Sequence, residues 1–136
     1  GAQAPSGNDR SCVLLVEGGA GRLLLAGDIS RHVESDVAAQ IGAGPPLVLV
    51  VPHHGSKSSS SAEFLAALKP VFALVSAGWH NRFRHPNPAI VERYVQAGIP
   101  LDNTASEGAL RVAFPATAPP QLVVRERLRQ HRYWRE

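Results

Sequence analysis

Two short apolar runs constrain the fold of this chain more than any other feature of its sequence. Residues 47–51 read LVLVV and residues 71–75 read VFALV, so neither run alternates between apolar and polar side chains. A continuous run of this length, rich in β-branched residues, is typical of a strand that is buried on both faces. Such strands occur in layered α/β proteins, where other elements cover a parallel sheet. The two runs therefore predict an α/β fold with a sheet at its centre.

Strand and helix patterns alternate on either side of these runs. Apolar runs at residues 11–17 and 22–26 flank the sequence GGAG, which predicts a β-hairpin near the start of the chain. Capping serines, a proline and a glycine bound the predicted helices, which cover residues 31–41, 61–68 and 88–97. The other predicted strands cover residues 99–101, 109–114 and 122–128, and the last two form a second hairpin.

The size and composition fit one globular domain. The chain has 136 residues, of which 44% are hydrophobic and 18% are charged, a balance that can bury a sizeable core. The single cysteine, Cys12, excludes an intrachain disulfide and a cysteine-rich zinc site. No apolar run approaches the length of a membrane span, and the first residues lack the apolar core of a signal peptide. Because the chain contains no methionine, we expect it to start inside a longer gene product.

The charge balance leaves the nature of the C-terminal end open. The net charge is +3, which is too mildly basic to define a dedicated DNA-binding module. Much of the excess lies near the C-terminus, at Arg125, Arg127, Arg129, Arg132 and Arg135. This basic end is either a solvated tail or a segment that contacts nucleic-acid phosphates or an anionic lipid surface.

Polar side chains that can bind a metal follow three of the predicted strands. Asp28 follows the strand at 22–26, His53 and His54 follow the run at 47–51, and His85 lies in the loop after the run at 71–75. If these strands are parallel neighbours, their carboxyl ends bring these side chains to one rim of the sheet. A carboxylate and two or three imidazoles are a ligand set for zinc, manganese or iron. Since adjacent strand residues point to opposite faces, we expect at most one of the two neighbouring histidines to be a direct ligand.

Simpler and rival interpretations exist for these residues. Asp28 can be a helix cap, and His85 can be an ordinary loop residue. Ser56 lies near both histidines, and Asp28 could complete a catalytic triad, but the G-x-S-x-G motif of a nucleophilic serine is missing. The run GSKSSSS at 55–61 instead offers hydroxyls, among them that of Ser59, and the ammonium group of Lys57 to a phosphate ester or phosphodiester. His80 and Asn81 precede His85; both could orient a substrate, and a surface role fits His80 equally well.

Six segments together resemble a known family. In chain order they read NDRSCVLLVE, LLLAGDI, VLVVPHHGSKSSSS, FLAALKP, ALVSAGWHNRFRHPNP and GALRV. Their order and spacing resemble the metallo-β-lactamase-like domain of the ComEC family over residues 8–114. We expect residues 1–7 to be a disordered N-terminus or cloning remnant, and residues 115–136 to be a hairpin arm and basic C-terminal tail.

The resemblance implies roles for individual residues. Asp28 matches the aspartate that bridges two metals, and His54, or less readily His53, matches the histidine of a second metal site. His85 matches the histidine of the family's histidine-proline pair near the active site. Independently of the resemblance, their amide, hydroxyl and ammonium groups add these residues to the substrate side of the predicted site: Asn81, Ser56, Lys57 and Ser59. Asn8 or Asp9 falls near the place where many relatives have another histidine ligand. Arg84 stands where the family usually has glycine before the histidine-proline pair, which could alter the turn of that loop.

The chain lacks the motif that supplies most metal ligands in this superfamily. No H-x-H-x-D-H sequence occurs, and no histidine follows an aspartate directly. The chain therefore resembles the C-terminal half of a metallo-β-lactamase αβ/βα sandwich, with a mixed sheet and helices on one face. The complete domain would bind up to two zinc or manganese ions, whereas we expect this half alone to bind metal weakly or not at all and to have negligible nuclease activity.

The resemblance also implies a cellular context and partners. ComEC proteins are inner-membrane channels for DNA uptake. The resemblance implies a metallohydrolase domain that faces the periplasmic, extracytoplasmic side and degrades the DNA strand that is not imported. The expected partners are DNA, the missing N-terminal half, the membrane channel and, through an exposed apolar sheet face, a second copy of the chain. Two alternatives remain: a non-catalytic DNA-binding or docking module, and a soluble metallohydrolase of the phosphocholine esterase or lactonase type.

Overall fold

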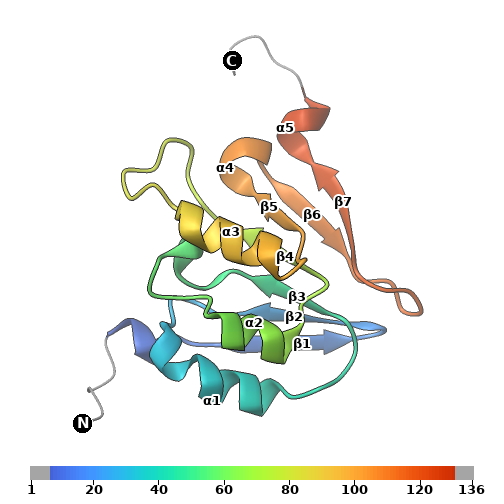
Figure 1. Ribbon diagram of the computed structural model, residues 1–136. Coiled ribbons are helices and arrows are strands. Elements are labelled where there is room, and N and C mark those ends of the chain that lie inside the picture. Colours follow the sequence, from blue (N-terminus) through green and yellow to red (C-terminus); the bar gives the residue numbers. More distant parts are fainter. Residues whose placement is uncertain (1–6, 131–136) are drawn as a thin grey trace.

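A computed structural model describes residues 7–130 of the chain as a layered α/β fold (Figure 1). The main sheet has five strands in the order β1 (Leu14–Gly18), β2 (Gly21–Leu25), β3 (Leu47–Val50), β4 (Phe72–Val75) and β5 (Leu101–Asn103). Strands β2 to β5 are parallel, and β1 pairs antiparallel with β2 as an edge strand. The sequence-based prediction of a mixed α/β sheet is therefore confirmed.

Helices connect the parallel strands and lie together on one face of the sheet (Figure 1). They are α1 (Arg31–Ile41), α2 (Ala62–Leu68) and α3 (Pro88–Gln96). The predicted caps are present: the Ser30 hydroxyl accepts a hydrogen bond from the His32 amide, and the Ser61 hydroxyl accepts one from the Phe64 amide. These bonds satisfy amides that the first turn of a helix cannot satisfy itself, so the sequence specifies where both helices begin.

The remaining elements are short. A separate hairpin contains β6 (Leu110–Ala113) and β7 (Gln121–Arg125), and the short helical turns are η1 (Asn8–Arg10), η2 (Pro52–Gly55), α4 (Thr104–Glu107) and α5 (Glu126–Arg129). No helix among residues 7–130 is long and apolar enough to cross a membrane. The expectations for residues 1–6 and for the end of the basic tail, residues 131–136, lie outside the described residues.

Several predicted strand boundaries were displaced, among them the start of the first strand, which begins at Leu14 and not at residue 11. The strand expected at residues 99–101 begins at Leu101, because the Ile99 amide closes the end of α3 on the Tyr94 carbonyl and the Ile99 side chain is buried in the core. The strand expected at 122–128 ends at Arg125, where the chain turns into α5. Helix α4 was not predicted; the Asn103 side chain and Glu107 form a reciprocal capping arrangement at its start.

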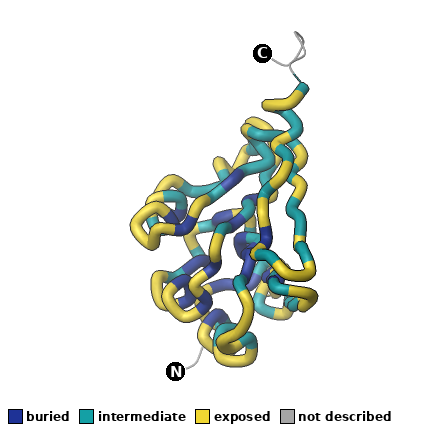
Figure 2. The backbone as a smooth tube through the Cα atoms, turned by 90° about the vertical axis from the view of Figure 1, so that its right-hand side faces the viewer, coloured by how far each residue is buried: buried dark blue, intermediate teal, exposed yellow. Residues whose placement is uncertain are grey.

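The two faces of the sheet differ in how well they are covered. On the helix face, strand residues such as Leu24, Leu49 and Val75 form one core with residues of α2 and α3 and are completely buried. On the opposite face, Leu14 and Val16 of β1 remain 54% and 47% exposed. Figure 2 shows that the buried segments lie in the middle of the molecule. The fold therefore has an incompletely covered apolar face, as expected for half of a sandwich.

Candidate functional site

The carboxyl ends of three parallel strands bring the predicted residues together. Leu25 of β2 is level with Val50 of β3, and Val50 is level with Leu74 of β4. Asp28 lies just beyond β2, and the two neighbouring histidines lie in η2 directly beyond β3. The expectation that these strands are parallel neighbours with a common rim is confirmed.

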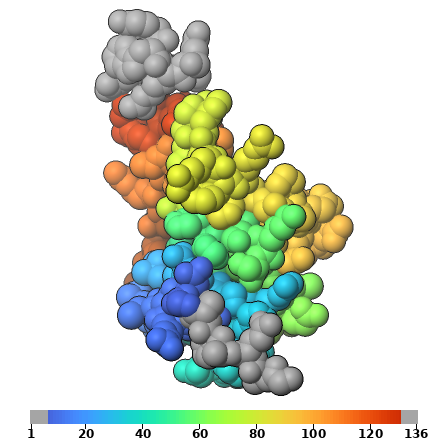
Figure 3. Space-filling model, turned by 90° about the vertical axis from the view of Figure 1, so that its left-hand side faces the viewer, coloured from blue at the N-terminus to red at the C-terminus, as the bar shows by residue number. Residues whose placement is uncertain are grey.

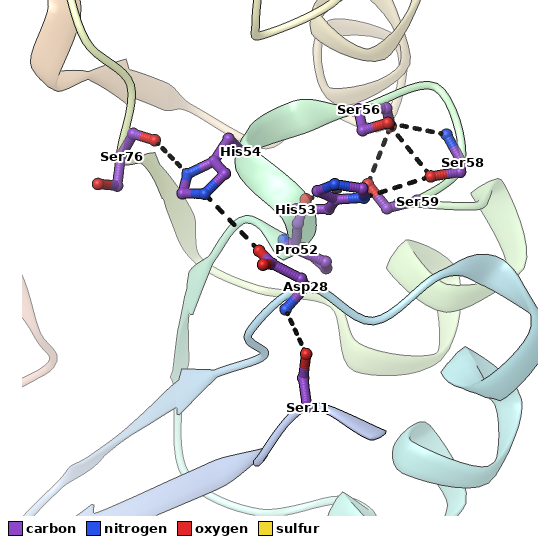
Figure 4. Close-up of polar contacts among 9 residues, drawn as sticks. All are labelled: Ser11, Asp28, Pro52, His53, His54, Ser56, Ser58, Ser59 and Ser76. Carbon is purple, nitrogen blue, oxygen red and sulfur yellow. Dashed lines mark hydrogen bonds and ion pairs between the residues drawn. The ribbon is translucent and has the colours of Figure 1, made fainter. Parts of the chain in front are cut away.

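The side chains of Asp28 and His54 face each other at this rim (Figure 4). The His54 Nε2 atom lies 3.6 Å from Asp28 Oδ1, and the two side chains are 52% and 47% exposed. His54 Nδ1 lies 2.7 Å from the Ser76 carbonyl oxygen. Since a carbonyl only accepts hydrogen bonds, Nδ1 carries a proton and donates it, and Nε2 is the nitrogen that faces Asp28. This arrangement orients the imidazole as in a histidine that ligates a metal.

The Asp28–His54 pair fits a metal in donor type and spacing. A zinc ion holds nitrogen and oxygen ligands at about 2.0–2.2 Å in a tetrahedron, which places two ligand atoms about 3.4 Å apart. The 3.6 Å separation between Nε2 and Oδ1 matches that spacing. However, within residues 7–130 no group of three or more histidine, cysteine, aspartate or glutamate side chains is arranged to hold a metal.

His53 and His54 point in different directions, for a reason that differs from the expected one. Strand alternation does not apply, because both residues adopt left-handed backbone angles in η2, with φ of 50° and 55°. His53 lies instead beside Ser58, whose hydroxyl is 3.4 Å from Nδ1, and its ring centroid is 6.1 Å from that of His85. The geometry therefore places His54, and not His53, next to Asp28.

His85 lies near His53, in a loop that hydrogen bonds from Asn81 hold in place. The Asn81 side chain accepts a hydrogen bond from the His85 amide at 2.8 Å and donates one to the His85 carbonyl at 2.7 Å. Burial, and then the nearby His53 and His54, lower the pKa of His85 below the ordinary value of 6.5. The folded state therefore favours neutral His85. The free energy of unfolding of the protein is expected to decrease as the pH falls below 6.5.

The predicted phosphate-binding serines form a hydrogen-bonded loop (Figure 4). Ser59 is buried, and its hydroxyl donates to the carbonyls of Pro52 and Ser56, so that hydroxyl holds the loop itself. Ser56 is half-buried with its hydroxyl 3.2 Å from that of Ser58, and Lys57 is exposed. Ser56 and Lys57 are thus the predicted phosphate contacts that remain accessible at the surface.

Asn8 and Asp9 lie near the position where relatives were expected to have another histidine ligand, and Asp9 is hydrogen-bonded to Ser30. Asp9 Oδ1 accepts hydrogen bonds from the Ser30 amide at 2.9 Å and from the Ser30 hydroxyl at 2.6 Å. Ser30 is the N-cap of α1, so Asp9 fixes the start of that helix. Asn8 is exposed in η1.

Sequence reasoning missed a buried acid that supports the serine loop. Glu34 of α1 is 1% exposed, and its carboxylate accepts hydrogen bonds from the amides of Ser60 and Ser61. Tyr94 and Arg93 of α3 also contact Ser60, through its hydroxyl and its carbonyl respectively. No sequence pattern indicates this role, because a glutamate within an amphipathic helix is usually solvated.

The architecture and the rim define a class of protein. The sheet is mixed and has helices on one face, and side chains that can bind a metal lie at the ends of its parallel strands. This is the arrangement of half of a metallo-β-lactamase-like sandwich. No family model matches the chain. Comparison with individual curated proteins identifies its family within this class.

Three curated proteins share substantial sequence identity with the chain. It is 37% identical to Competence protein ComA of Neisseria gonorrhoeae over 131 residues, which are 95% of this chain. It is 37% identical to Recombination protein 2 of Haemophilus influenzae over 79% of the chain, and 33% identical to ComE operon protein 3 of Bacillus subtilis over 80% of the chain. The chain belongs to the ComEC family, as a C-terminal domain of the ComEC type. It spans 18%, 13% and 14% of the length of these three relatives.

Proposed function

We propose that this chain is part of a metal-dependent nuclease domain that serves a DNA-uptake competence channel. The observation that carries the proposal is the Asp28–His54 pair at the ends of two parallel strands. The relative from Neisseria gonorrhoeae is named a competence protein, which supports the cellular role. In this proposal the parent protein lies in the inner membrane, the domain faces the periplasm, and the substrate is the DNA strand that is not imported.

The residues of this chain would hold one part of the metal centre. Asp28 would bridge up to two zinc or manganese ions, and His54, oriented by the Ser76 carbonyl, would complete one site. When bound, such ions stabilise charge on a phosphodiester oxygen and lower the pKa of a bound water. His85 would remain neutral near the substrate, and the exposed ammonium group of Lys57 would attract the phosphate backbone.

The incompletely covered apolar face is the proposed seat of the other half of the domain. Leu14, Val16 and Leu25 are between 36% and 54% exposed there, and burying them would stabilise a sandwich. In this chain by itself the same face is open to a second copy, and sedimentation would detect that association as a homodimer.

We expect this chain alone to bind zinc only weakly. Structural zinc sites with four ligands have binding free energies of about 10–16 kcal/mol, and two donors would supply about half of that. The dissociation constant is therefore expected to be about micromolar or weaker, and Asp28→Asn should weaken it further. Isothermal titration calorimetry at neutral pH measures both values. Submicromolar binding by the native chain would contradict the two-donor interpretation.

The nuclease proposal is tested on the complete domain, which includes the residues preceding this chain in its parent protein. Asp28→Asn is expected to lower manganese-dependent cleavage of DNA by about 100-fold or more, because the metal loses a ligand. Asp36→Asn removes an equally charged but exposed carboxylate from α1 and should leave the rate unchanged. Cleavage that is insensitive to Asp28→Asn would remove Asp28 from the metal centre. A domain that binds DNA but never cleaves it would indicate a docking module.

A further inference from the structure

The loop between β4 and α3, residues 76–87 and hereafter the aromatic loop, exposes two large rings to solvent. Trp79 and Phe83 are 62% and 65% exposed. In Figure 3 the atoms of this part of the chain, coloured yellow-green, lie on the surface next to the orange and red atoms of α4 and α5. Exposed aromatic rings of this size are unfavourable in water and are enriched at binding surfaces.

The aromatic loop adjoins the candidate metal pair. Phe83 and His54 line the same cavity of about 300 Å³, together with Asn81 and His85. The Phe83 ring stacks on His85 with a centroid distance of 5.8 Å and an interplanar angle of 29°. A ligand held on Phe83 would therefore lie directly beside the rim where Asp28 and His54 meet.

An arginine guanidinium lies over each of the two rings, those of Phe83 and Trp79. The guanidinium carbon of Arg82 lies 4.7 Å from the Phe83 ring centroid, and that of Arg127 lies 5.0 Å from the Trp79 ring centroid. Arg82 and Arg84 form no ion pair with any residue between 7 and 130. The Phe83 ring also packs against His85. The loop therefore combines aromatic rings with positive charge, which suits an anionic ligand that also carries flat apolar groups.

The conformation of the aromatic loop is fixed by internal hydrogen bonds. The Asn81 side chain bonds to both backbone groups of His85 and to the Gly78 carbonyl, and the Arg84 amide donates to the Asn81 carbonyl at 3.0 Å. Since the loop is braced by these bonds, a ligand need not order it, which reduces the entropy cost of binding.

We propose that Trp79 and Phe83 form a stacking platform for unpaired bases of single-stranded DNA, and that Arg82, Arg84 and Arg127 contact the adjoining phosphates. Bases in a duplex are already stacked on each other, whereas the bases of a single strand are free to stack on aromatic rings or guanidinium planes. The inference rests on the proposed function, because it identifies the form of DNA that reaches the same rim. Stacking tolerates every base, so the platform would accept DNA of any sequence.

The test measures binding of the full chain to a fluorescent oligothymidylate of about ten nucleotides. Fluorescence anisotropy is recorded with a chelator present, so that neither metal nor cleavage enters the result. Trp79→Ala and Phe83→Ala are each expected to weaken binding about 5- to 100-fold. Phe114→Ala is the matched control, because Phe114 is a partly exposed aromatic residue at the other end of the β6–β7 hairpin from Arg127. It should leave the affinity unchanged.

Further ligands and variants separate base stacking from other causes of binding. An abasic backbone of the same length should bind the native chain more weakly, and Trp79→Ala should not weaken it further. Trp79→Phe should retain most of the affinity for oligothymidylate, and circular dichroism should show that every variant is folded. Equal binding by the native chain and by folded Trp79→Ala and Phe83→Ala would overturn the proposal. So would a Trp79-dependent association with anionic phospholipid vesicles in the absence of oligonucleotide binding.

A second readout keeps this proposal separate from the nuclease proposal. In the complete domain, Trp79→Ala is expected to raise KM for single-stranded DNA while leaving kcat unchanged. An unchanged KM would overturn the platform and leave the nuclease proposal standing. Stacking-dependent binding by a domain that does not cleave DNA would support the platform and contradict the nuclease proposal.

Discussion

Replacing Gly55 by alanine is expected to lower the free energy of unfolding by about 2–4 kcal/mol. Gly55 ends η2 with φ of +80°, a conformation that side chains disfavour, and a Cβ atom there would lie 2.6 Å from Pro86 Cβ and 2.9 Å from Pro86 Cα. Because the second contact is with backbone, a rotamer change cannot relieve it. Urea unfolding followed by circular dichroism measures the loss as a lower midpoint.

Gly98→Ala is the matched control for this collision. Gly98 also has a positive φ, of +70°, but no atom outside its immediate neighbours lies within 4 Å of the point that a Cβ atom would occupy there. Its replacement should therefore cost only the backbone strain, about 1 kcal/mol. Equal losses of unfolding free energy in Gly55→Ala and Gly98→Ala would show that the contact with Pro86 does not destabilise Gly55→Ala.

The contact between Gly55 and Pro86 matters for the site as well as for stability. The Gly55 carbonyl accepts a hydrogen bond from the Asn87 amide at 2.9 Å. This bond and the close packing hold the turn of His53 and His54 against the aromatic loop. The same substitution should therefore disturb the histidine side chains, which NMR spectra of the imidazole protons would detect.

Removing the Glu34 carboxylate is expected to destabilise the fold by about 2–5 kcal/mol. Glu34→Ala leaves the amides of Ser60 and Ser61 without their acceptors, and Ser60 is completely buried. The side chain also fills space between α1 and the start of α2, so its loss leaves a cavity. Thermal or urea unfolding would measure the loss.

Two further variants distinguish the hydrogen bonds of Glu34 from other effects. Glu34→Gln keeps the side-chain volume and one carbonyl acceptor. The free energy of unfolding of this variant should therefore lie between those of the native chain and of Glu34→Ala. Asp36→Ala removes an exposed carboxylate two residues further along α1 and should change stability little. A Glu34→Ala variant as stable as Asp36→Ala would contradict the proposed support of the serine loop.

Much of the framework could be predicted from local patterns. The runs at 47–51 and 71–75 became β3 and β4, and serine caps precede α1 and α2 as predicted. These features depend on side-chain periodicity and on hydrogen bonds between neighbours in sequence. Such signals are present in any short window of the chain.

The site was predictable in composition but not in geometry. Asp28 and the two neighbouring histidines were identified because they follow strands, and only the family resemblance favoured His54 over His53. The divergence of His53 and His54 arises from left-handed backbone angles in η2. The roles of Glu34 and Gly55 were not predicted at all. Their partners lie 26 or more residues away in sequence, at Ser60 and Pro86, and only packing brings them together.

The sequence by itself determined the alternation of strands and helices, the helix starts and the polar residues that follow each strand. It could do so because hydrophobic periodicity and capping are local properties of the chain. Only the tertiary structure decided that His54 faces Asp28, that Glu34 supports the serine loop, and that Trp79 and Phe83 are exposed beside the rim. These outcomes depend on contacts between distant segments, which form when the sheet and its helices pack together.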